Sequence, residues 1–220
     1  MPLLPAALIF PMARIVQEVI EITAPSVEPI TLAEAKAQAR IDTSTSAEDD
    51  LISDIYIPAS RKYLENRTGI TFHQKTLEWM FSDFPASGEP IRLRGATPLI
   101  SITTLKYKVS DGTETTWGTS NYIADTDSKV GRLVPAYGIT YPTADYPSWP
   151  VRIRGVAGIA TASPITEAEP MAKLAIAEIV SAAWCNRDAE ELPERPIIET
   201  VKFSYGVEAM IAALQREYVF

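Results

Sequence analysis

The apolar residues of this 220-residue chain change their spacing twice. In residues 47–68 they recur every three or four positions, as Leu51, Ile55 and Ala59 do, which is the period of an amphipathic helix. Between residues 70 and 158 they alternate with polar residues, as strands require, and after Pro170 the helical spacing returns. We therefore predict an α+β fold, in which a helical core of about four helices carries a β-rich insertion of short antiparallel strands.

This pattern divides the chain into four predicted segments. We expect an extended N-terminal arm in residues 1–29 and the first half of the helical core in 30–69. The β-rich insertion follows in 70–160, and residues 161–220 supply the second half of the core with a C-terminal segment. Hydrophobic residues make up 46% of the chain, which is ordinary globular usage and argues against disorder of the whole chain.

The first sixteen residues resemble a signal peptide only superficially. No positive charge precedes their apolar run, and Pro2, Pro5 and Pro11 interrupt it. We expect an arm that packs on a neighbouring subunit, with a cleaved signal as the alternative. No other stretch has the length of a membrane span, so we expect no membrane partner.

Local signals set the ends of the predicted helices. Thr31 and Glu34 form a capping-box pattern before a short Ala-rich helix, and Gly69 is a suitable C-terminal residue for the helix over 47–68. Pro58 lies inside that helix and should kink it near Asp54. Pro170 should begin a helix to about residue 186 that is buried on several sides, and residues 207–218 should form a last amphipathic helix.

The middle of the chain carries strand and turn signals. The alternating pattern slips by one residue near Thr103 and Thr104, which predicts a β-bulge. Asp111 and Gly112 predict a hairpin turn, with residues 113–117 as the return strand. Residues 135–150 and 187–204 are rich in turn-forming or charged residues and should be irregular loops.

Composition excludes several kinds of site. A single cysteine, Cys185, rules out an intrachain disulfide, and with one histidine, His73, the usual Cys/His metal sites are excluded. We interpret Cys185 as a small buried thiol and His73 as a surface or interface residue. The net charge of −8 argues against tight wrapping of DNA, but it suits a surface that DNA passes without sticking.

No catalytic motif is visible, so we predict a protein that is not an enzyme and needs no cofactor or metal. No phosphate-binding loop, dinucleotide fingerprint or nucleophile elbow is present. Asp50 and Asp54 share a helix face, which leaves a Mg²⁺ nuclease site as an alternative to helix capping and solvation. The four dispersed tryptophans fit core or interface anchoring better than a ligand cage.

Two arginine pairs are the least ordinary surface feature. Arg92 and Arg94 share one strand face, and Arg152 and Arg154 repeat the pattern. If the two strands are neighbours, one side of the sheet carries four guanidinium groups. Such a face could be solvated and paired with carboxylates, could contact a subunit or an acidic partner, or could contact DNA directly.

The order of several short motifs resembles the head-tail connector, or adaptor, proteins of long-tailed phages, which have relatives in gene transfer agents. The resemblance covers about residues 28–215, in the branch where an HK97-like helical core carries a β-rich insertion. Pro58 and the long apolar N-terminus depart from the family pattern. The residues that carry the resemblance are 28–36 (EPITLAEAK), 50–52 (DLI), 59–69 (ASRKYLENRTG), 131–138 (GRLVPAYG), 151–158 (VRIRGVAG), Trp184 with 186–187 (NR), and 205–210 (YGVEAM).

The resemblance implies a structural protein of the virion, assembled in the host cytoplasm. Such adaptors form a ring of identical subunits, commonly dodecameric, beneath the portal protein. The ring extends the DNA channel, through which DNA passes without sequence-specific binding, and it docks a stopper or tail-completion protein. The alternatives are a tail terminator, a packaging accessory, a carboxylate-metal nuclease and a secreted binding module.

In relatives the C-terminal segment tends to reach into the portal. The resemblance therefore makes residues of that segment candidate contacts, beside the four arginines. These residues are Tyr205, Val207, Met210 and Phe220.

Overall fold

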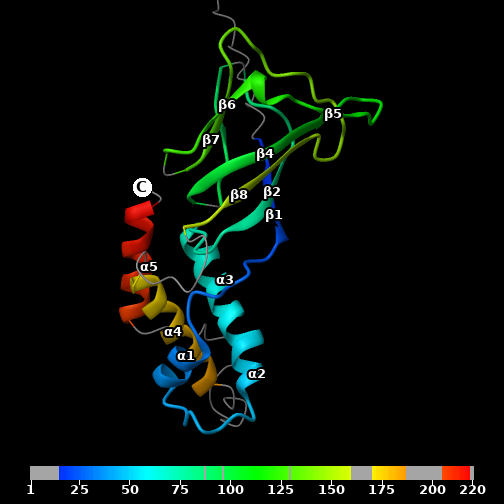
Figure 1. Ribbon diagram of the computed structural model, residues 1–220. Coiled ribbons are helices and arrows are strands. Elements are labelled where there is room, and N and C mark those ends of the chain that lie inside the picture. The colour runs from blue at the N-terminus through cyan, green and yellow to red at the C-terminus, as the bar shows by residue number, and fades with distance from the viewer. Residues whose placement is uncertain are drawn as a thin grey trace, which may run out of the picture.

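The computed structural model describes residues 15–86, 88–95, 97–128, 130–159, 170–186 and 205–218. Helices occupy one end of the molecule and strands the other, as Figure 1 shows. The strands pair antiparallel in two sheets, and the predicted α+β class is confirmed. The β-rich end is built mostly from one continuous part of the chain between two helical parts, which is the predicted order of elements.

The first helix, α1 (Leu32–Ala39), begins at the predicted capping box. The Thr31 hydroxyl accepts the backbone N–H of Glu34 at 3.2 Å, and the Glu34 carboxylate accepts the backbone N–H of Thr31 at 2.8 Å. This backbone hydrogen bond is the first reason why the pKa of Glu34 lies below its usual value. The capping prediction is therefore confirmed.

Pro58 is accommodated by a π-helical turn. Three elements follow one another here without a break: α2 (Asp49–Leu51), the π turn η1 (Ile52–Tyr56) and α3 (Ile57–Thr68). The π turn contains Asp54, whose carbonyl the Pro58 ring would meet in a regular α-helix. The irregularity predicted at Asp54 is present, and α3 ends at Gly69, which has a left-handed φ of 73° as predicted.

Two further helices complete the helical end. They are α4 (Pro170–Cys185), which begins at the predicted proline, and α5 (Tyr205–Tyr218). Ile176 of α4 and Leu214 of α5 are fully buried in the same apolar cluster as Leu64 of α3. The burial predicted for α4 on several sides is incomplete, because Met171 and Leu174 are 37% and 48% exposed.

The larger sheet has the strand order β1-β2-β8-β4-β5. Its first strand, β1, lies inside the segment predicted as an extended arm and forms one edge of the sheet. The predicted bulge is present, because the pairing of β4 with β8 shifts between Ile102 and Thr104. The strands are β1 (Gln17–Thr23), β2 (Lys75–Phe81), β4 (Leu99–Lys108), β5 (Glu114–Thr116) and β8 (Val151–Ala157).

Gly155 of β8 lies opposite this bulge. A Cβ atom there would stand 2.6 Å from the Ser101 carbonyl oxygen, so only glycine allows the two strands to approach so closely. The predicted hairpin at Asp111 and Gly112 is also present and joins β4 to β5.

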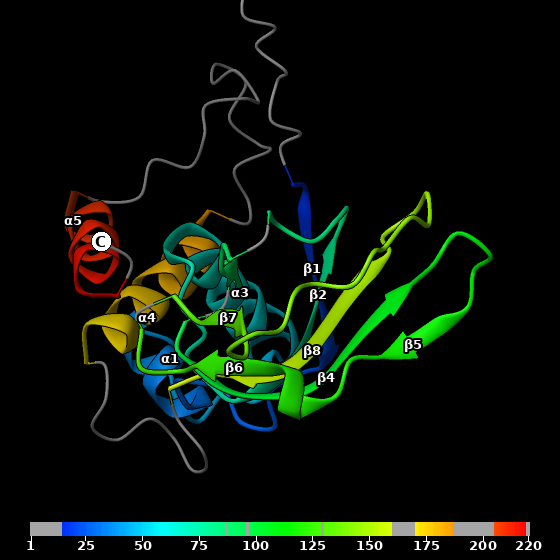
Figure 2. The ribbon, with the colours of Figure 1, turned by 90° about the horizontal axis from the view of Figure 1, so that it is seen from above.

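The β-rich end also contains a smaller sheet, with the strand order β3-β7-β6. Its strands are β3 (Ile91–Arg92), β6 (Tyr122–Asp125), which follows the 3₁₀ turn η2 (Thr119–Asn121), and β7 (Arg132–Pro135). Trp79, Leu133 and Ile153 belong to the second apolar cluster of the molecule and are fully buried. In Figure 2, which is seen from above, β6 and β7 lie in front of the helices and beside the larger sheet.

Two sequence-based interpretations are wrong. His73 is only 3% exposed, because it lies between α3 and the start of β2, at the junction of helices and sheet. Cys185 is exposed, because it ends α4 where that helix leaves the core. The loop predicted at 187–204 lies outside the described residues. None of the described helices combines the length and apolar character that crossing a membrane requires.

Candidate interaction surfaces

The structure separates the two arginine pairs. Arg92 ends β3 in the small sheet and is paired with Arg132 of β7, whereas Arg152 and Arg154 lie on β8 in the larger sheet. The strands that carry the pairs are therefore not neighbours, and the predicted surface of four guanidinium groups does not form. Each pair belongs to a different surface.

Arg152 and Arg154 lie on the face of the larger sheet opposite its apolar cluster. Arg154 donates to the Glu78 carboxylate at 3.1 Å, while Arg152 lies 3.9 Å from that carboxylate, and its Nε has no hydrogen-bond partner. Together with Thr103 and Thr104, these side chains line a polar hollow of about 250 Å³. The open-face cluster comprises its charged residues: Glu78, Lys106, Glu114, Arg152 and Arg154.

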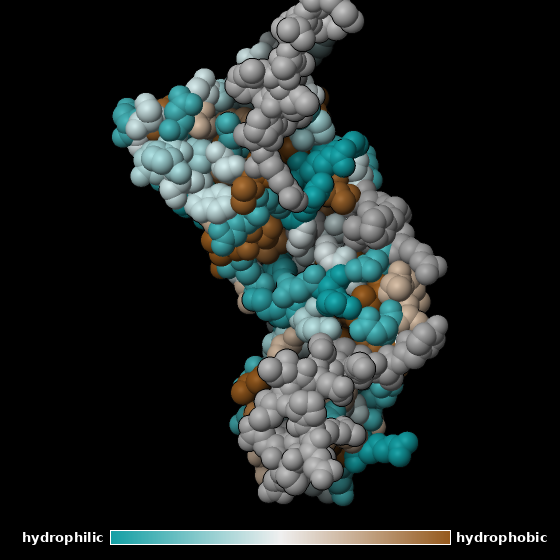
Figure 3. Space-filling model, turned by 180° about the vertical axis from the view of Figure 1, so that it is seen from behind, coloured by the Kyte–Doolittle hydropathy of each residue, from teal (hydrophilic) through white to brown (hydrophobic). Residues whose placement is uncertain are grey.

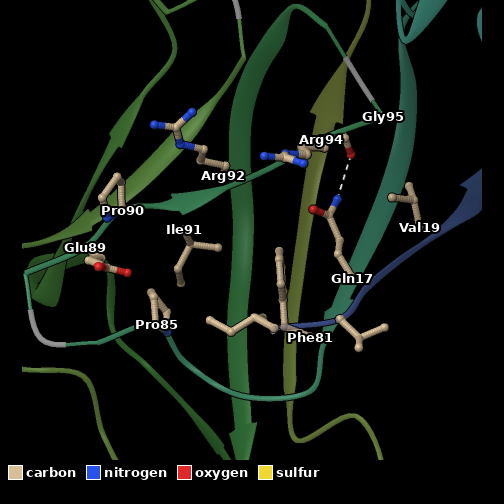
Figure 4. A pocket seen from close by; sticks show the side chains of 12 residues that line it. Gln17, Val19, Phe81, Pro85, Glu89, Pro90, Ile91, Arg92, Arg94 and Gly95 are labelled. Carbon is tan, nitrogen blue, oxygen red and sulfur yellow. Dashed lines mark hydrogen bonds between the residues drawn. The ribbon is translucent and has the colours of Figure 1, made fainter. Parts of the chain in front are cut away.

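Arg92 and Arg94 lie on the opposite side of that sheet, at a larger pocket of about 820 Å³. We call it the edge pocket, because one wall is the edge strand β1 and the other is the segment from Glu89 to Gly95 (Figure 4). Figure 4 shows Phe81, Pro85 and Ile91 turned toward a shared space between these walls. The pocket is therefore apolar inside and carries charges at its rim.

Hydrogen bonds fix both ends of the pocket wall. The Tyr141 hydroxyl donates to the Glu89 carbonyl at 2.7 Å, and burial raises the pKa of Tyr141 to about 12. At the other end, the Arg94 carbonyl accepts from the Gln17 amide at 2.7 Å and from the Trp79 indole at 3.0 Å. The pocket is thus part of the folded chain before any partner binds.

A chain of buried ion pairs joins the helical end to the larger sheet. We call it the junction network. The Glu65 carboxylate of α3 accepts from Arg61 at 2.9 Å and from Lys75 of β2 at 2.7 Å. Its outer members are Glu28, which pairs with Arg61 at 2.8 Å, and Glu21 of β1, which pairs with Lys75 at 3.0 Å.

The inner members of this network are almost free of solvent. The side chains of Arg61, Glu65 and Lys75 are only 6–8% exposed. Burial opposes the charge on Arg61, but its bond to Glu28 and the nearby carboxylates outweigh this, and the pKa of Arg61 is raised. In the sequence, the one signal of this network is the spacing of four between Arg61 and Glu65 on a helix.

The helical end exposes apolar side chains on three elements, α2, η1 and α4. Ile55 of η1 is 57% exposed and Leu51 of α2 is 37% exposed. Leu174 and Met171 are exposed on α4, which contacts η1. Viewed from behind, the molecule shows separate apolar patches between hydrophilic ones (Figure 3). The exposed apolar residues of the helical end are candidate contacts, because burial against another protein would remove them from water.

The C-terminal candidates have different positions. Tyr205 begins α5, and Val207 is only 1% exposed because it packs into the helical core. Met210 is partly buried against the same core. Phe220 lies outside the described residues. A partner contact of this segment stays a prediction.

Two acidic residues at the start of the long helix, Asp49 and Asp54, have structural partners. Asp49 pairs with buried Lys36, which also donates to the Thr45 carbonyl at 2.6 Å, and Asp54 accepts from Ser53 at 2.9 Å. Across the described part of the chain, no three His, Cys, Asp or Glu side chains converge as a group that could hold a metal ion.

Comparison with known proteins links this fold to particle necks. Residues 29–118 match the family described as phage gp6-like head-tail connector proteins, which confirms the predicted resemblance. The fold is similar to a chain in the neck of an empty GTA particle computed with C6 symmetry, with a TM-score of 0.67 and 21% identity over 90% of this chain and 95% of that chain.

Two other solved structures agree. One is a chain in the virion of a native gene transfer agent (GTA) particle, with a TM-score of 0.65 and 20% identity over 90% of this chain and 94% of that chain. The other is a chain in the neck of a native GTA particle computed with C12 symmetry, with a TM-score of 0.55 and 18% identity over 88% and 94%. No curated protein matches this chain.

Proposed function

Because residues 29–118 match the phage gp6-like head-tail connector family, we propose that this chain is a structural connector subunit in the neck of a tailed phage or a gene transfer agent particle. The observation that carries the proposal is the similarity of almost the whole fold to chains of GTA necks and virions. The role is mechanical rather than enzymatic, and it is localised to the virion.

The proposed assembly is a closed ring, dodecameric by analogy with the twelvefold symmetry of one neck structure. Head-to-tail contacts between identical subunits generate a ring when the rotation closes. The exposed apolar residues on η1 and α4 are suited to such contacts, because a neighbour would remove them from water. We place the ring beneath the portal, where it extends the DNA channel.

The same proposal assigns the remaining surfaces to partners. The C-terminal segment, about residues 201–220, would contact the portal, and the open-face cluster would contact the stopper or tail-completion protein. Arg152 suits an acidic partner, because its side chain is 38% exposed and its guanidinium group lies 3.9 Å from Glu78, too far for a hydrogen bond. The net charge of −8 suits a channel that DNA crosses without sticking.

A second candidate follows from the same comparison. The similar chains belong to the neck of one GTA particle and to the virion of another. This origin also fits another ring component, such as a tail terminator or a packaging accessory. The two candidates differ in where the ring lies. A connector sits between portal and tail, so its loss stops tail attachment after packaging.

The decisive experiment removes this chain from the particle. Without it, heads should package DNA but remain tailless, and electron microscopy of the complete particle should show a ring of this chain directly below the portal. Normal tail joining without the chain would overturn the connector proposal. Failure to package DNA would instead favour a packaging accessory.

A substitution at the proposed ring contact tests the assembly more gently. Ile55→Glu should abolish ring assembly, because a carboxylate would replace an apolar contact between subunits. Ile123→Glu on β6 is the matched control, since Ile123 has the same 57% exposure but lies in the small sheet. Both variants should keep the wild-type circular dichroism spectrum. If the Ile55→Glu chain forms rings as well as the Ile123→Glu chain does, Ile55 does not lie in the contact.

A further inference from the structure

The edge pocket is lined mostly by apolar residues. Apart from its charged rim and Gln17, its lining is made of aliphatic, aromatic, proline and glycine residues. Its volume of about 820 Å³ is in the range of pockets that enclose a ligand or several side chains. The sheet edge beside it also carries Val16, which is 55% exposed. The pocket therefore fits a short apolar segment.

The chain contains a segment of matching chemistry. Residues 1–14 (MPLLPAALIFPMAR) consist of ten apolar residues, three prolines and one arginine. The prolines lack backbone N–H groups, so at these three positions no donor would be left without an acceptor in an apolar site.

The position of the segment agrees with its chemistry. It joins the described chain at Ile15, which lines the pocket together with Val16. Fourteen residues can span at most about 50 Å when extended, so the segment has length both to leave its subunit and to place several apolar side chains elsewhere. We propose that the edge pocket holds apolar residues from the segment 1–14 of a neighbouring copy of the chain.

Entry into the segment's own pocket is less favourable because of how Val16 is held. Its N–H donates to the Ser82 hydroxyl at 3.0 Å, and its carbonyl accepts the Ser82 N–H at 3.1 Å. Because Ile15 and Val16 form part of the wall of their own pocket, a segment returning to that pocket would have to turn back along this wall. A neighbour's segment has no such constraint, and exchange from each copy to the next produces a closed ring.

This inference rests on the proposed ring, because a neighbouring copy must be present. Two kinds of cysteine-bearing copy, both with Cys185→Ser, would be co-expressed in particles: a tagged Leu8→Cys chain and an untagged Glu89→Cys chain. A short bis-maleimide should link a tagged chain to an untagged one. A third chain would carry both Leu8→Cys and Glu89→Cys. If this chain links only within itself and the two single-cysteine chains give no mixed product, the proposal is wrong. It is also wrong if no link forms at all.

A substitution in the pocket supplies the control. Val16→Glu in the pocket-side partner should lower the mixed product at least about tenfold, because the segment would then cover an unpaired carboxylate. Ile123→Glu, at 57% exposure, should leave it unchanged. If Val16→Glu has no effect, the pocket assignment is wrong. Imaging of the wild-type neck separates this outcome from failure of the connector proposal, because the ring would still be seen there.

Discussion

The junction network and the open-face cluster are built from the same kinds of residue but differ in burial. Each contains two or three carboxylates and two or three cationic side chains that converge from different elements. The inner side chains of the network are 6–8% exposed. In the open-face cluster Lys106, Arg152 and Arg154 are 38–45% exposed and Glu114 is 35% exposed, and Glu78, at 12%, is the one member that is mostly buried. Ion pairing alone therefore does not say what a charged cluster does.

This difference in burial assigns different roles. A buried charge cannot give up a partner without a large free-energy cost, so the junction network fixes how the helical end meets the larger sheet. An exposed pair is worth little to stability, because water and salt screen it. The open-face cluster can therefore exchange its ion pairs for contacts with a partner without loosening the fold.

The largest expected effect comes from breaking the network at its centre. Glu65→Gln removes the carboxylate shared by Arg61 and Lys75 and leaves both cations buried with fewer counter-charges. It should lower the free energy of unfolding by about 3–5 kcal/mol. Urea denaturation followed by circular dichroism would measure the loss.

Glu114→Gln is the matched control in the open-face cluster. It removes the partner of Lys106, a pair whose side chains are 35% and 43% exposed. The expected loss is about 0–1 kcal/mol. Equal losses for Glu65→Gln and Glu114→Gln would show that burial does not separate the two clusters.

A smaller effect should appear as a dependence on pH, at His73 beside the network. Burial lowers the pKa of His73 below its ordinary value of 6.5, with Glu28, Arg61 and Glu65 as the nearby charges. Below pH 6.5 the unfolded chain therefore binds a proton that the folded chain resists, so stability falls as the pH falls. Above pH 6.5 both states are neutral at this residue and its effect disappears.

The variant His73→Gln isolates this contribution from the carboxylates. The difference in unfolding free energy between pH 7.5 and pH 5.5 should be smaller in the variant than in the wild type. The same urea titrations at the two pH values measure it. An identical pH dependence in both proteins would mean that His73 gains its proton as easily in the folded chain as in the unfolded one.

The helices were largely predictable because their signals are local. The Thr31 capping box, Gly69 and Pro170 each act within one turn of helix, and all three mark helix ends in the structure. The hairpin at Asp111 and Gly112 and the bulge near Thr104 are local too. Pro58 was expected to kink the helix near Asp54, and the structure accommodates it with a π turn.

The sites depended on pairings between distant residues, which one sequence does not reveal. Arg92 and Arg152 have the same alternating pattern, and only the strand order shows that they lie in different sheets. Likewise, Glu65 meets Lys75 and, through it, Glu21, because β1 joins the sheet as an edge strand. The burial of His73 could not be predicted for the same reason, since it depends on how the helices meet the sheet.

The smallest expected effect tests the open-face cluster directly. Arg154→Gln removes a 3.1 Å ion pair with Glu78, but Arg154 is 45% exposed, so the free energy of unfolding should fall by no more than about 1 kcal/mol at low salt. In 1 M NaCl, where charges are screened within about 3 Å, wild type and variant should be indistinguishable. Urea titrations at both salt concentrations measure this. If the loss of unfolding free energy persists in 1 M NaCl and approaches that of Glu65→Gln, Arg154 stabilises the fold. The open-face cluster could then not exchange its ion pairs for contacts with a partner.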